Sequence, residues 1–225
     1  VPNIQGWDDY PLYDEMRELI SNRNIPIIIE GDRACYILGE SWKGNAQNTK
    51  NAVFIAVGTG IGAGIMNGGE VLRGEMDITG AAGWMALSSP FQNQYKGVGC
   101  FEYYASGNGI ADRAKDLILE NRIPSILHEK DFKDITARDV FDSYDLNDPL
   151  AVKVISQAVE FWGMAAANFI SLFNPKKIIF GGGVFGPGKK LIPRISQEAE
   201  KWAQPISFQR TEILESILGG DAGLT

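Results

Sequence analysis

The chain has 225 residues, of which 44% are apolar and 22% charged, a composition typical of a folded globular protein rather than a disordered or fibrous one. Its 28 acidic and 21 basic residues give a net charge of −7 without a strong basic cluster, so we expect no nucleic-acid binding by this segment. We find no apolar run near the roughly 20 residues of a membrane-spanning helix and no secretion signal. Two cysteines exclude a disulfide framework. We therefore expect a cytoplasmic protein that makes no membrane contact.

The first predicted elements are a short strand and the helix that follows it. Residues 25–30 are apolar and β-branched with Pro26 near their start, which predicts a buried strand. Good helix formers over 33–42 predict a helix that Gly44 ends, so Asp32 stands at the junction of the two elements. Open α/β sheets present catalytic groups at such junctions, where a carboxylate can accept the proton of a substrate hydroxyl. The alternative is that Asp32 only caps the helix.

A glycine-rich turn joins the next two predicted strands, 52–57 and 61–66. Its glycines allow the backbone to approach a phosphate closely, and a threonine adds a hydroxyl group. The turn lacks the Lys of a Walker A motif and no helix follows it, so a plain β-hairpin is the alternative. The turn and its continuation are Gly58-Thr59-Gly60-Ile61-Gly62-Ala63-Gly64.

The remaining elements alternate between strands and helices. In chain order we predict a strand over 70–73, a long functional loop over 74–99, helices from Cys100 with a break at 107–109, a linker over 123–134 followed by a short helix, an amphipathic helix over 151–173, a strand over 177–180 and a helix over 189–202. This order predicts a layered α/β fold. Between the last strand and helix, Gly181, Gly182 and Gly183 could admit a nucleotide against bare backbone, or only form a tight connection.

Taken together, these motifs resemble one known family. The run from Ala56 to Ile65, followed by Asn67-Gly68-Gly69 and Leu72-Arg73-Gly74, is similar to the signature of the ROK (repressor, ORF, kinase) family, a branch of the actin-like ATPases that includes bacterial glucokinases and sugar-responsive repressors. Further similar blocks follow in the expected order: Gly80-Ala81-Ala82-Gly83, residues 99–107, Phe173-Asn174-Pro175 with 178–184, and residues 220–224. The resemblance covers nearly the whole chain.

The resemblance implies an actin-like ATPase (ribonuclease H-like) fold, in which helices flank a mixed sheet. It also implies a glucokinase-like activity, the ATP-dependent and Mg²⁺-dependent phosphorylation of a hexose. It also implies that residues 1–225 form the C-terminal large domain of a two-domain kinase. The N-terminal domain of the family carries a first phosphate loop of the Asp-x-Gly-x-Thr type, which this sequence lacks. We therefore expect a longer protein, and, by the same resemblance, a homodimer.

The resemblance also assigns roles to individual residues. Asp32 matches the general base that deprotonates the sugar hydroxyl, and Gly31, Glu102 and Trp84 match sugar-binding positions. The nucleotide-binding positions are those of the second phosphate loop and of the adenosine contact: Gly58, Thr59, Gly60, Gly62, Gly181, Gly182 and Gly183.

Several positions depart from the family pattern. A Glu that binds sugar is Trp84 here, a His is Leu87, and an Asn is Gly31, so three polar sugar contacts are missing. Trp84 can either stack on a sugar face or pack in the core. The family's cysteine-rich zinc motif aligns with residues 93–100 and retains one thiolate, so we expect no structural zinc.

Two other functions are compatible with these departures. One is the sugar-sensing domain of a ROK transcriptional repressor, and the other is a degenerate kinase that binds nucleotide without turnover. A winged-helix segment of about 60 to 80 residues ahead of the N-terminal domain would mark a repressor, whereas a Met shortly before the first phosphate loop would mark an enzyme.

Overall fold

The computed structural model describes residues 6, 10–120, 122–219, 223 and 224, and it divides the chain into two compact units, Val1–Gly31 and Asp32–Thr225. In the first unit the helix α1 (Leu12–Leu19) is fixed by the Arg17 guanidinium, which donates hydrogen bonds to the carbonyls of Arg23 and Ile25.

The strand predicted over residues 25–30 does not form. The segment has no regular secondary structure, and Ile28 within it is 78% exposed. An apolar β-branched run becomes a strand only when a neighbour takes up its backbone hydrogen bonds. The five strands of the described part of the chain offer it no such neighbour, so the prediction is wrong.

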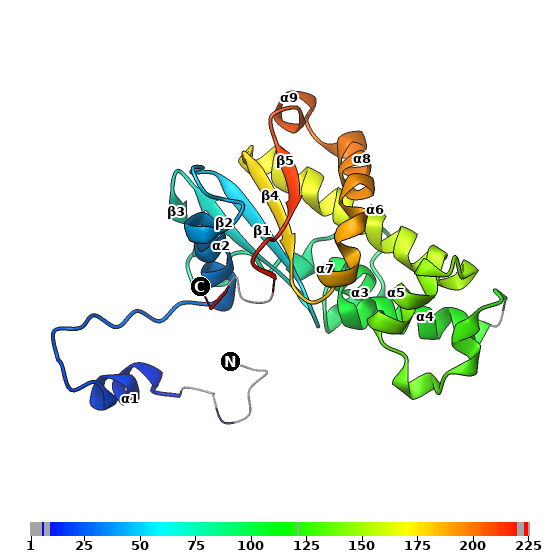
Figure 1. The fold of residues 1–225 in the computed structure, drawn as a ribbon, viewed down its shortest axis with the longest axis horizontal. Helices are drawn as coiled ribbons and strands as arrows, with labels where there is room; N and C mark the ends of the chain where they lie inside the picture. The colour runs from blue at the N-terminus through cyan, green and yellow to red at the C-terminus, as the bar shows by residue number, and fades with distance from the viewer. Residues whose placement is uncertain (1–5, 7–9, 121, 220–222, 225) are drawn as a thin grey trace. The chain divides into compact units, whose positions relative to one another are not determined.

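The second unit is built on one mixed sheet (Figure 1). The pairs β3–β2 and β2–β1 are antiparallel, while β1–β4 and β4–β5 are parallel. In spatial order the strands are β3 (Glu70–Val71), β2 (Ile61–Asn67), β1 (Ala52–Val57), β4 (Lys177–Gly181) and β5 (Glu212–Glu215). The mixed sheet and three of its strands confirm the sequence prediction, and β3 is shorter than predicted.

The residues of the central strands explain why both faces of the sheet are covered. β1 is apolar throughout, and successive side chains point to opposite faces. Val53 and Ile55 pack into the core formed with α6, whereas Phe54 packs with Ile37 of α2. A strand that is apolar on both faces is stable only between two layers, and the fold supplies both layers.

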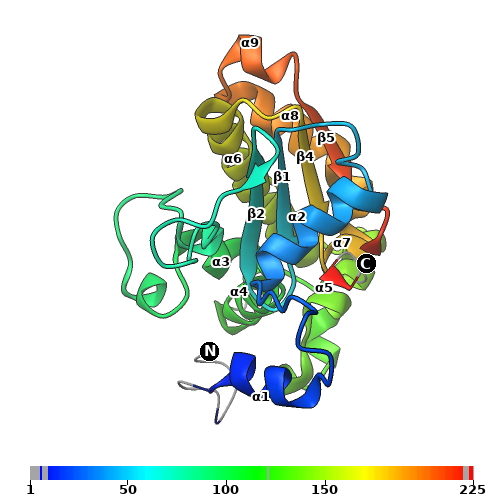
Figure 2. The ribbon, with the colours of Figure 1, turned by 90° about the vertical axis from the view of Figure 1, so that its left-hand side faces the viewer.

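Helices form these two layers (Figure 2). α2 (Asp32–Lys43) lies across one face, while α6 (Pro149–Phe173) and α8 (Ile192–Trp202) cover the other. All three helices confirm the predicted positions, with α6 beginning at a capping residue, Asp148, that accepts a hydrogen bond from the Ala151 N–H at 3.0 Å. The remaining helices are α3 (Cys100–Ala105), α4 (Gly107–Glu120), α5 (Ala137–Asp145), α7 (Phe185–Gly188) and α9 (Pro205–Phe208).

The predicted break in the helices after Cys100 occurs at a single residue, Ser106. Its hydroxyl accepts a hydrogen bond from the Gly109 N–H at 2.9 Å and thereby caps α4. The long loop over 74–99 contains two 3-10 turns, Ala82–Trp84 and Asn93–Lys96.

α6 is, by length and composition, apolar enough to cross a membrane, which the sequence inspection had not identified. Two thirds of its apolar stretch (67%) is buried inside the protein. Buried side chains on all sides of the helix, among them Trp162 and Phe169, belong to the main core. This burial is what the central helix of a layered α/β protein requires.

Candidate functional site

The turn between β1 and β2 is held by the start of α4. The Gly107 N–H donates to the carbonyl of Gly58 at 2.8 Å, and the Asn108 N–H donates to that of Thr59 at 3.4 Å. Because the peptide unit is planar and trans, the N–H groups of Thr59 and Gly60 point away from these carbonyls. Neither N–H has a partner among the described residues, so both are available to an anion.

Glu102 of α3 supports the same turn from the other side. Its Oε2 accepts a hydrogen bond from the Ile61 N–H at 2.7 Å. A Cβ atom at Gly60 or at Gly83 would lie 2.7 Å from this oxygen, so both positions need glycine to admit the carboxylate. Glu102 is half-buried rather than an exposed helix carboxylate. Its predicted contact with sugar stays a prediction.

A pocket of about 560 Å³ lies beside this turn. Its size falls within the range of small-ligand sites. It brings the β1–β2 turn together with Gly183, so the two glycine-rich segments that the sequence predicts to bind nucleotide meet in one cavity. Among its lining residues are Gly58, Thr59, Asn108, Ala111, Lys115 and Gly183.

Residues of α4 and α5 add polar groups that the sequence did not single out. Lys115 and Asp112 line the pocket as an ion pair at 3.6 Å, and Arg138 lines it from the first turn of α5. Asp112 and Lys115 lie on α4 about one and two helical turns after Gly107, at a spacing that could have identified these two residues once the break at Ser106 was placed.

The loop after β4 is shaped by its glycines. Gly182 has a φ of 90°, which favours glycine, and the Val184 N–H donates to the carbonyl of Val57 at 3.1 Å. Gly181 and Gly182 do not line the first pocket. They line a second one of about 480 Å³, together with Ser216, and Gly183 borders both pockets.

Asp32 is the first residue of α2 and is exposed. Its Oδ1 accepts a hydrogen bond from the Arg33 N–H at 2.8 Å. The side chain thus accepts a hydrogen bond at the start of the helix and still faces solvent. Capping the helix and acting as the predicted general base are therefore compatible roles. Gly31 is the last residue of the first unit.

The start of α2 sits on the glycines of β2. The Arg33 guanidinium donates to the carbonyl of Ile78 at 3.1 Å. A Cβ atom at Gly62 would lie 2.9 Å from Cδ of Arg33, and one at Gly64 would overlap the Arg33 carbonyl. Gly62 therefore contributes to the site by admitting α2 and does not line the large pocket.

Tyr36 lies on the next turn of α2. Its ring stacks on that of Phe54 with centroids 5.2 Å apart. Burial, with smaller contributions from Asp32 and Cys35, raises the pKa of the Tyr36 hydroxyl. The hydroxyl therefore stays protonated beside Asp32 at neutral pH.

Trp84 is 58% exposed, so the core-packing alternative is wrong. Its backbone packs closely against Gly99, because a Cβ atom at Gly99 would lie 2.6 Å from the Trp84 Cα. Its predicted stacking on sugar stays a prediction. Leu87, in contrast, is half-buried against the core.

A tyrosine cluster occupies the region that aligns with the zinc motif. The hydroxyl groups of the buried Tyr95 and Tyr104 are 2.8 Å apart, and both rings contact that of Tyr103. Burial, with the hydrogen bond to Tyr104, raises the pKa of Tyr95. In the described part of the chain no three His, Cys, Asp or Glu side chains gather to hold a metal, and the expectation of no structural zinc stays a prediction.

The mixed sheet, its two helical layers and the glycine loops at the ends of its strands define an α/β protein of the actin-like ATPase fold. The sequence model of the ROK family matches residues 1–225, and the chain belongs to this family.

Its relatives include both enzymes and regulators. A glucokinase of Halalkalibacterium halodurans is 35% identical over 224 residues, which are 97% of this chain and 66% of that protein. The crystal structure of a ROK family glucokinase from Streptomyces griseus in complex with glucose and AMPPNP is 27% identical with a TM-score of 0.80, covering 100% of this chain and 72% of that one. A ROK family transcriptional regulator, described as a homologue of the Escherichia coli MLC protein, is 29% identical with a TM-score of 0.82 over 94% of this chain and 52% of that one.

Proposed function

We propose that this chain supplies the C-terminal large domain of an ATP-dependent sugar kinase. The observation that carries the proposal is the 560 Å³ pocket, in which the β1–β2 turn meets Gly183 and the start of α4. The Streptomyces griseus relative, whose structure contains glucose and AMPPNP, supports the same reading.

The nucleotide is proposed to occupy this pocket. The free N–H groups of Thr59 and Gly60 bind a phosphate, and Gly183 admits the nucleoside against bare backbone. Lys115 and Arg138 add positive charge on the wall formed by α4 and α5. Mg²⁺ enters with the phosphates of ATP as part of the substrate.

The sugar is proposed to bind on the side of the turn that carries Asp32. Asp32 accepts the proton of the attacking sugar hydroxyl while the hydroxyl oxygen forms a bond to the γ-phosphorus of ATP. The bond between the γ-phosphorus and the oxygen of the β-phosphate breaks, and ADP leaves. Trp84 stacks on the sugar, and Glu102 completes the site. Alignment of the hydroxyl supplies most of the rate, because phosphoryl transfer needs little covalent chemistry from the protein.

The experiment uses the full-length protein and measures ADP release with ATP and Mg²⁺ over glucose, mannose, fructose, N-acetylglucosamine and N-acetylmannosamine. We expect turnover on one of these sugars, and a loss of at least about 100-fold in kcat in Asp32→Ala, in line with the loss of a general base. Glu70→Ala changes an exposed carboxylate on β3 and is the control. ATP binding without turnover on any sugar would overturn the kinase proposal.

The similarity to a transcriptional regulator favours a second candidate, a sugar-sensing domain. The replacement of a polar sugar contact by Trp84 also fits a sensor. A sensor binds sugar without releasing ADP. Measuring both sugar binding and ADP release over the same five sugars therefore separates the two functions.

A further inference from the structure

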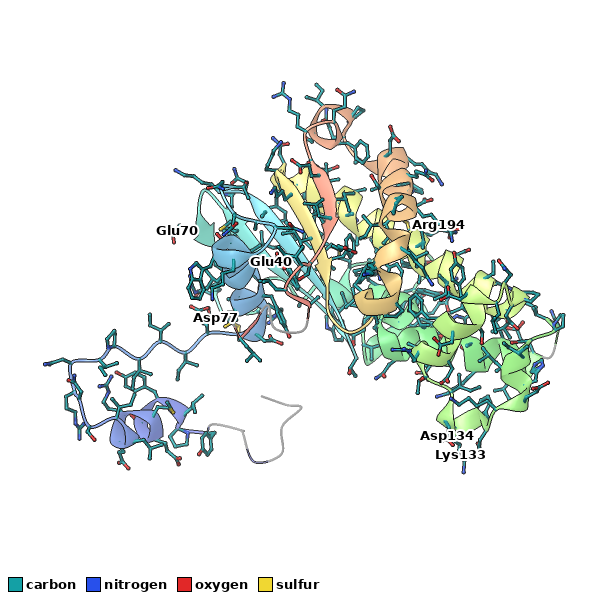
Figure 3. The ribbon with its side chains drawn as sticks, in the orientation of Figure 1. Glu40, Glu70, Asp77, Lys133, Asp134 and Arg194 are labelled. Carbon is teal, nitrogen blue, oxygen red and sulfur yellow. The ribbon has the colours of Figure 1, made fainter. Side chains whose placement is uncertain are left out.

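Glu40 and Asp148 are the charged side chains that are buried in the described part of the chain. Asp148 caps α6, but Glu40 lies in the third turn of α2, where no cap is needed (Figure 3). A fully buried carboxylate costs free energy unless hydrogen bonds compensate it. Its position inside the fold therefore calls for a specific set of partners.

Both carboxylate oxygens of Glu40 accept hydrogen bonds. Oε2 accepts from the Asn45 N–H at 2.7 Å, and Oε1 accepts from the hydroxyl of Ser216 beyond β5. A Cβ atom at Gly44 would overlap Oε2, so glycine at this position admits the carboxylate. The Ser216 oxygen in turn accepts from the N–H groups of Leu218 and Gly219, each at 3.2 Å.

The partners of Glu40 are themselves tied to the sheet. The Asn45 side-chain amide donates to the carbonyl of Glu215 at 2.7 Å, and Lys177 Nζ donates to the Asn45 carbonyl at 2.6 Å. Ser216 also contacts the end of β4, because its N–H donates to the Phe180 carbonyl at 2.8 Å and a Cβ atom at Gly181 would lie 3.1 Å from the Ser216 Cβ. Glu40 therefore joins α2 to the strand ends at which the second pocket forms.

The other contacts of α2 are mainly packing contacts. The helix rests on Gly62 and Gly64 of β2, and Ile37 packs with Phe54. Near Asp32 the Arg33 guanidinium donates to the Ile78 carbonyl, and at the other end of the helix Glu40 adds two directional hydrogen bonds. Asp32 is eight residues before Glu40 on the same rigid helix, about 12 Å at 1.5 Å per residue. A shift of the helix along its axis would move Asp32 by the same amount.

We propose that Glu40 is a positioning residue that fixes α2 along its axis, and with it Asp32, relative to the loop Gly181–Gly183. This inference rests on the proposed kinase function. The site needs a carboxylate because both neighbours donate, and the Ser216 oxygen is already used by two N–H groups. A glutamine at position 40 directs its NH₂ group at one of these donors and loses one hydrogen bond in either orientation.

The test measures kcat and the sugar KM of the full-length protein for Glu40→Gln, with Glu200→Gln on the exposed side of α8 as the control. We expect about a 10-fold fall in kcat with less than about a 2-fold change in sugar KM, since a small misplacement of the base affects the transition state most. Ser216→Ala, which keeps the carboxylate, should reproduce part of the loss and covers the case in which Glu40→Gln does not fold.

A further measurement separates positioning from a general structural role. In the Asp32→Asn background, Glu40→Gln should lower the residual kcat by less than about 2-fold, because residues that act through one another are not additive. An equal loss in both backgrounds, or an unchanged kcat in Glu40→Gln, overturns the proposal.

Amide hydrogen exchange tests the role of Glu40 independently of the proposed kinase function. Faster exchange over residues 33–38 in Glu40→Gln, with no change over α8, is expected whether or not sugar is turned over. A wild-type protein without turnover overturns the kinase function, while unchanged exchange over 33–38 overturns the role of Glu40.

Discussion

Trp84 stands where the ROK resemblance places a sugar-binding carboxylate, and more than half of its surface is exposed. An exposed side chain contributes little to the free energy of unfolding, so Trp84→Ala should lower it by less than about 0.5 kcal/mol. If the indole stacks on a sugar, its loss should weaken sugar binding, and we expect the sugar KM to rise about 5-fold, since aromatic contacts contribute on the order of 1 kcal/mol. Steady-state kinetics and urea unfolding measure the two effects.

Trp202 provides the matched control for that substitution. Its exposed fraction, 62%, is similar to that of Trp84, but Trp202 lies on α8 and its indole N–H donates to Glu198. Trp202→Ala should leave the sugar KM unchanged. If both variants have the wild-type KM, Trp84 does not contact sugar.

At the scale of elements, the start of α5 matters because it forms one wall of the large pocket. Thr136 and Asp139 make a reciprocal capping box, and Lys130 forms an ion pair with Asp139. Burial tends to raise the pKa of Asp139, but the hydrogen bonds from Lys130 and Thr136 outweigh it and lower the pKa to about 2 from a usual 3.8. The carboxylate form therefore stabilises the folded state.

The sign of the pH dependence follows from this lowered pKa. Asp139 should contribute about 2 kcal/mol above pH 4 and lose this contribution as the pH falls from about 4 to about 2. Urea unfolding of the wild type and Asp139→Asn should thus differ most at pH 5 and converge near pH 2. The exposed Asp142 on the same helix supplies the control Asp142→Asn. A difference that does not depend on pH would contradict the assignment.

Helices and strands whose own apolar pattern shows that they are buried could be predicted from the sequence. β1 and β4 are short β-branched apolar runs, and α6 shows helical spacing, so all three were predicted. β5 was not predicted, because its Glu212-Ile213-Leu214-Glu215 sequence becomes a strand only by pairing with β4. Residues 25–30 failed for the converse reason, because the run has strand composition without a partner strand.

The candidate site shows the same division. The glycine loops follow strands and could be identified from local sequence, and Asp32 was identified at the start of α2 although the strand predicted before it does not form. Glu40 could not be identified, and the hydrogen bond of Glu102 to the Ile61 N–H could not be predicted, because the partners Ser216 and Ile61 lie 176 and 41 residues away in the chain. The hydroxyl pair of Tyr95 and Tyr104 likewise depends on packing between the loop over 74–99 and α3, which the spacing of residues in the sequence does not show.

On the scale of the whole molecule, the large pocket joins segments from the β1–β2 turn to α7 within the second unit. A ligand that bridges them should therefore stabilise this unit as a whole. A sugar at the proposed site beside Asp32 would contact other residues. Nucleotide binding and sugar binding can therefore be separated by blocking the large pocket alone.

Ala111 allows this separation, since it lies on α4 at the pocket wall and is buried. In the wild-type full-length protein, a non-hydrolysable ATP analogue at 100 times its Kd should stabilise by about 2.7 kcal/mol, raising the Tm by about 5 °C. Ala111→Leu places three more carbons at the wall and should abolish most of this rise, while the shift produced by sugar alone persists. Each shift is taken against the same variant without ligand, so any loss of baseline stability cancels. An unchanged nucleotide shift in Ala111→Leu would place the nucleotide outside this pocket, because a ligand that fills the cavity cannot share it with the added side chain.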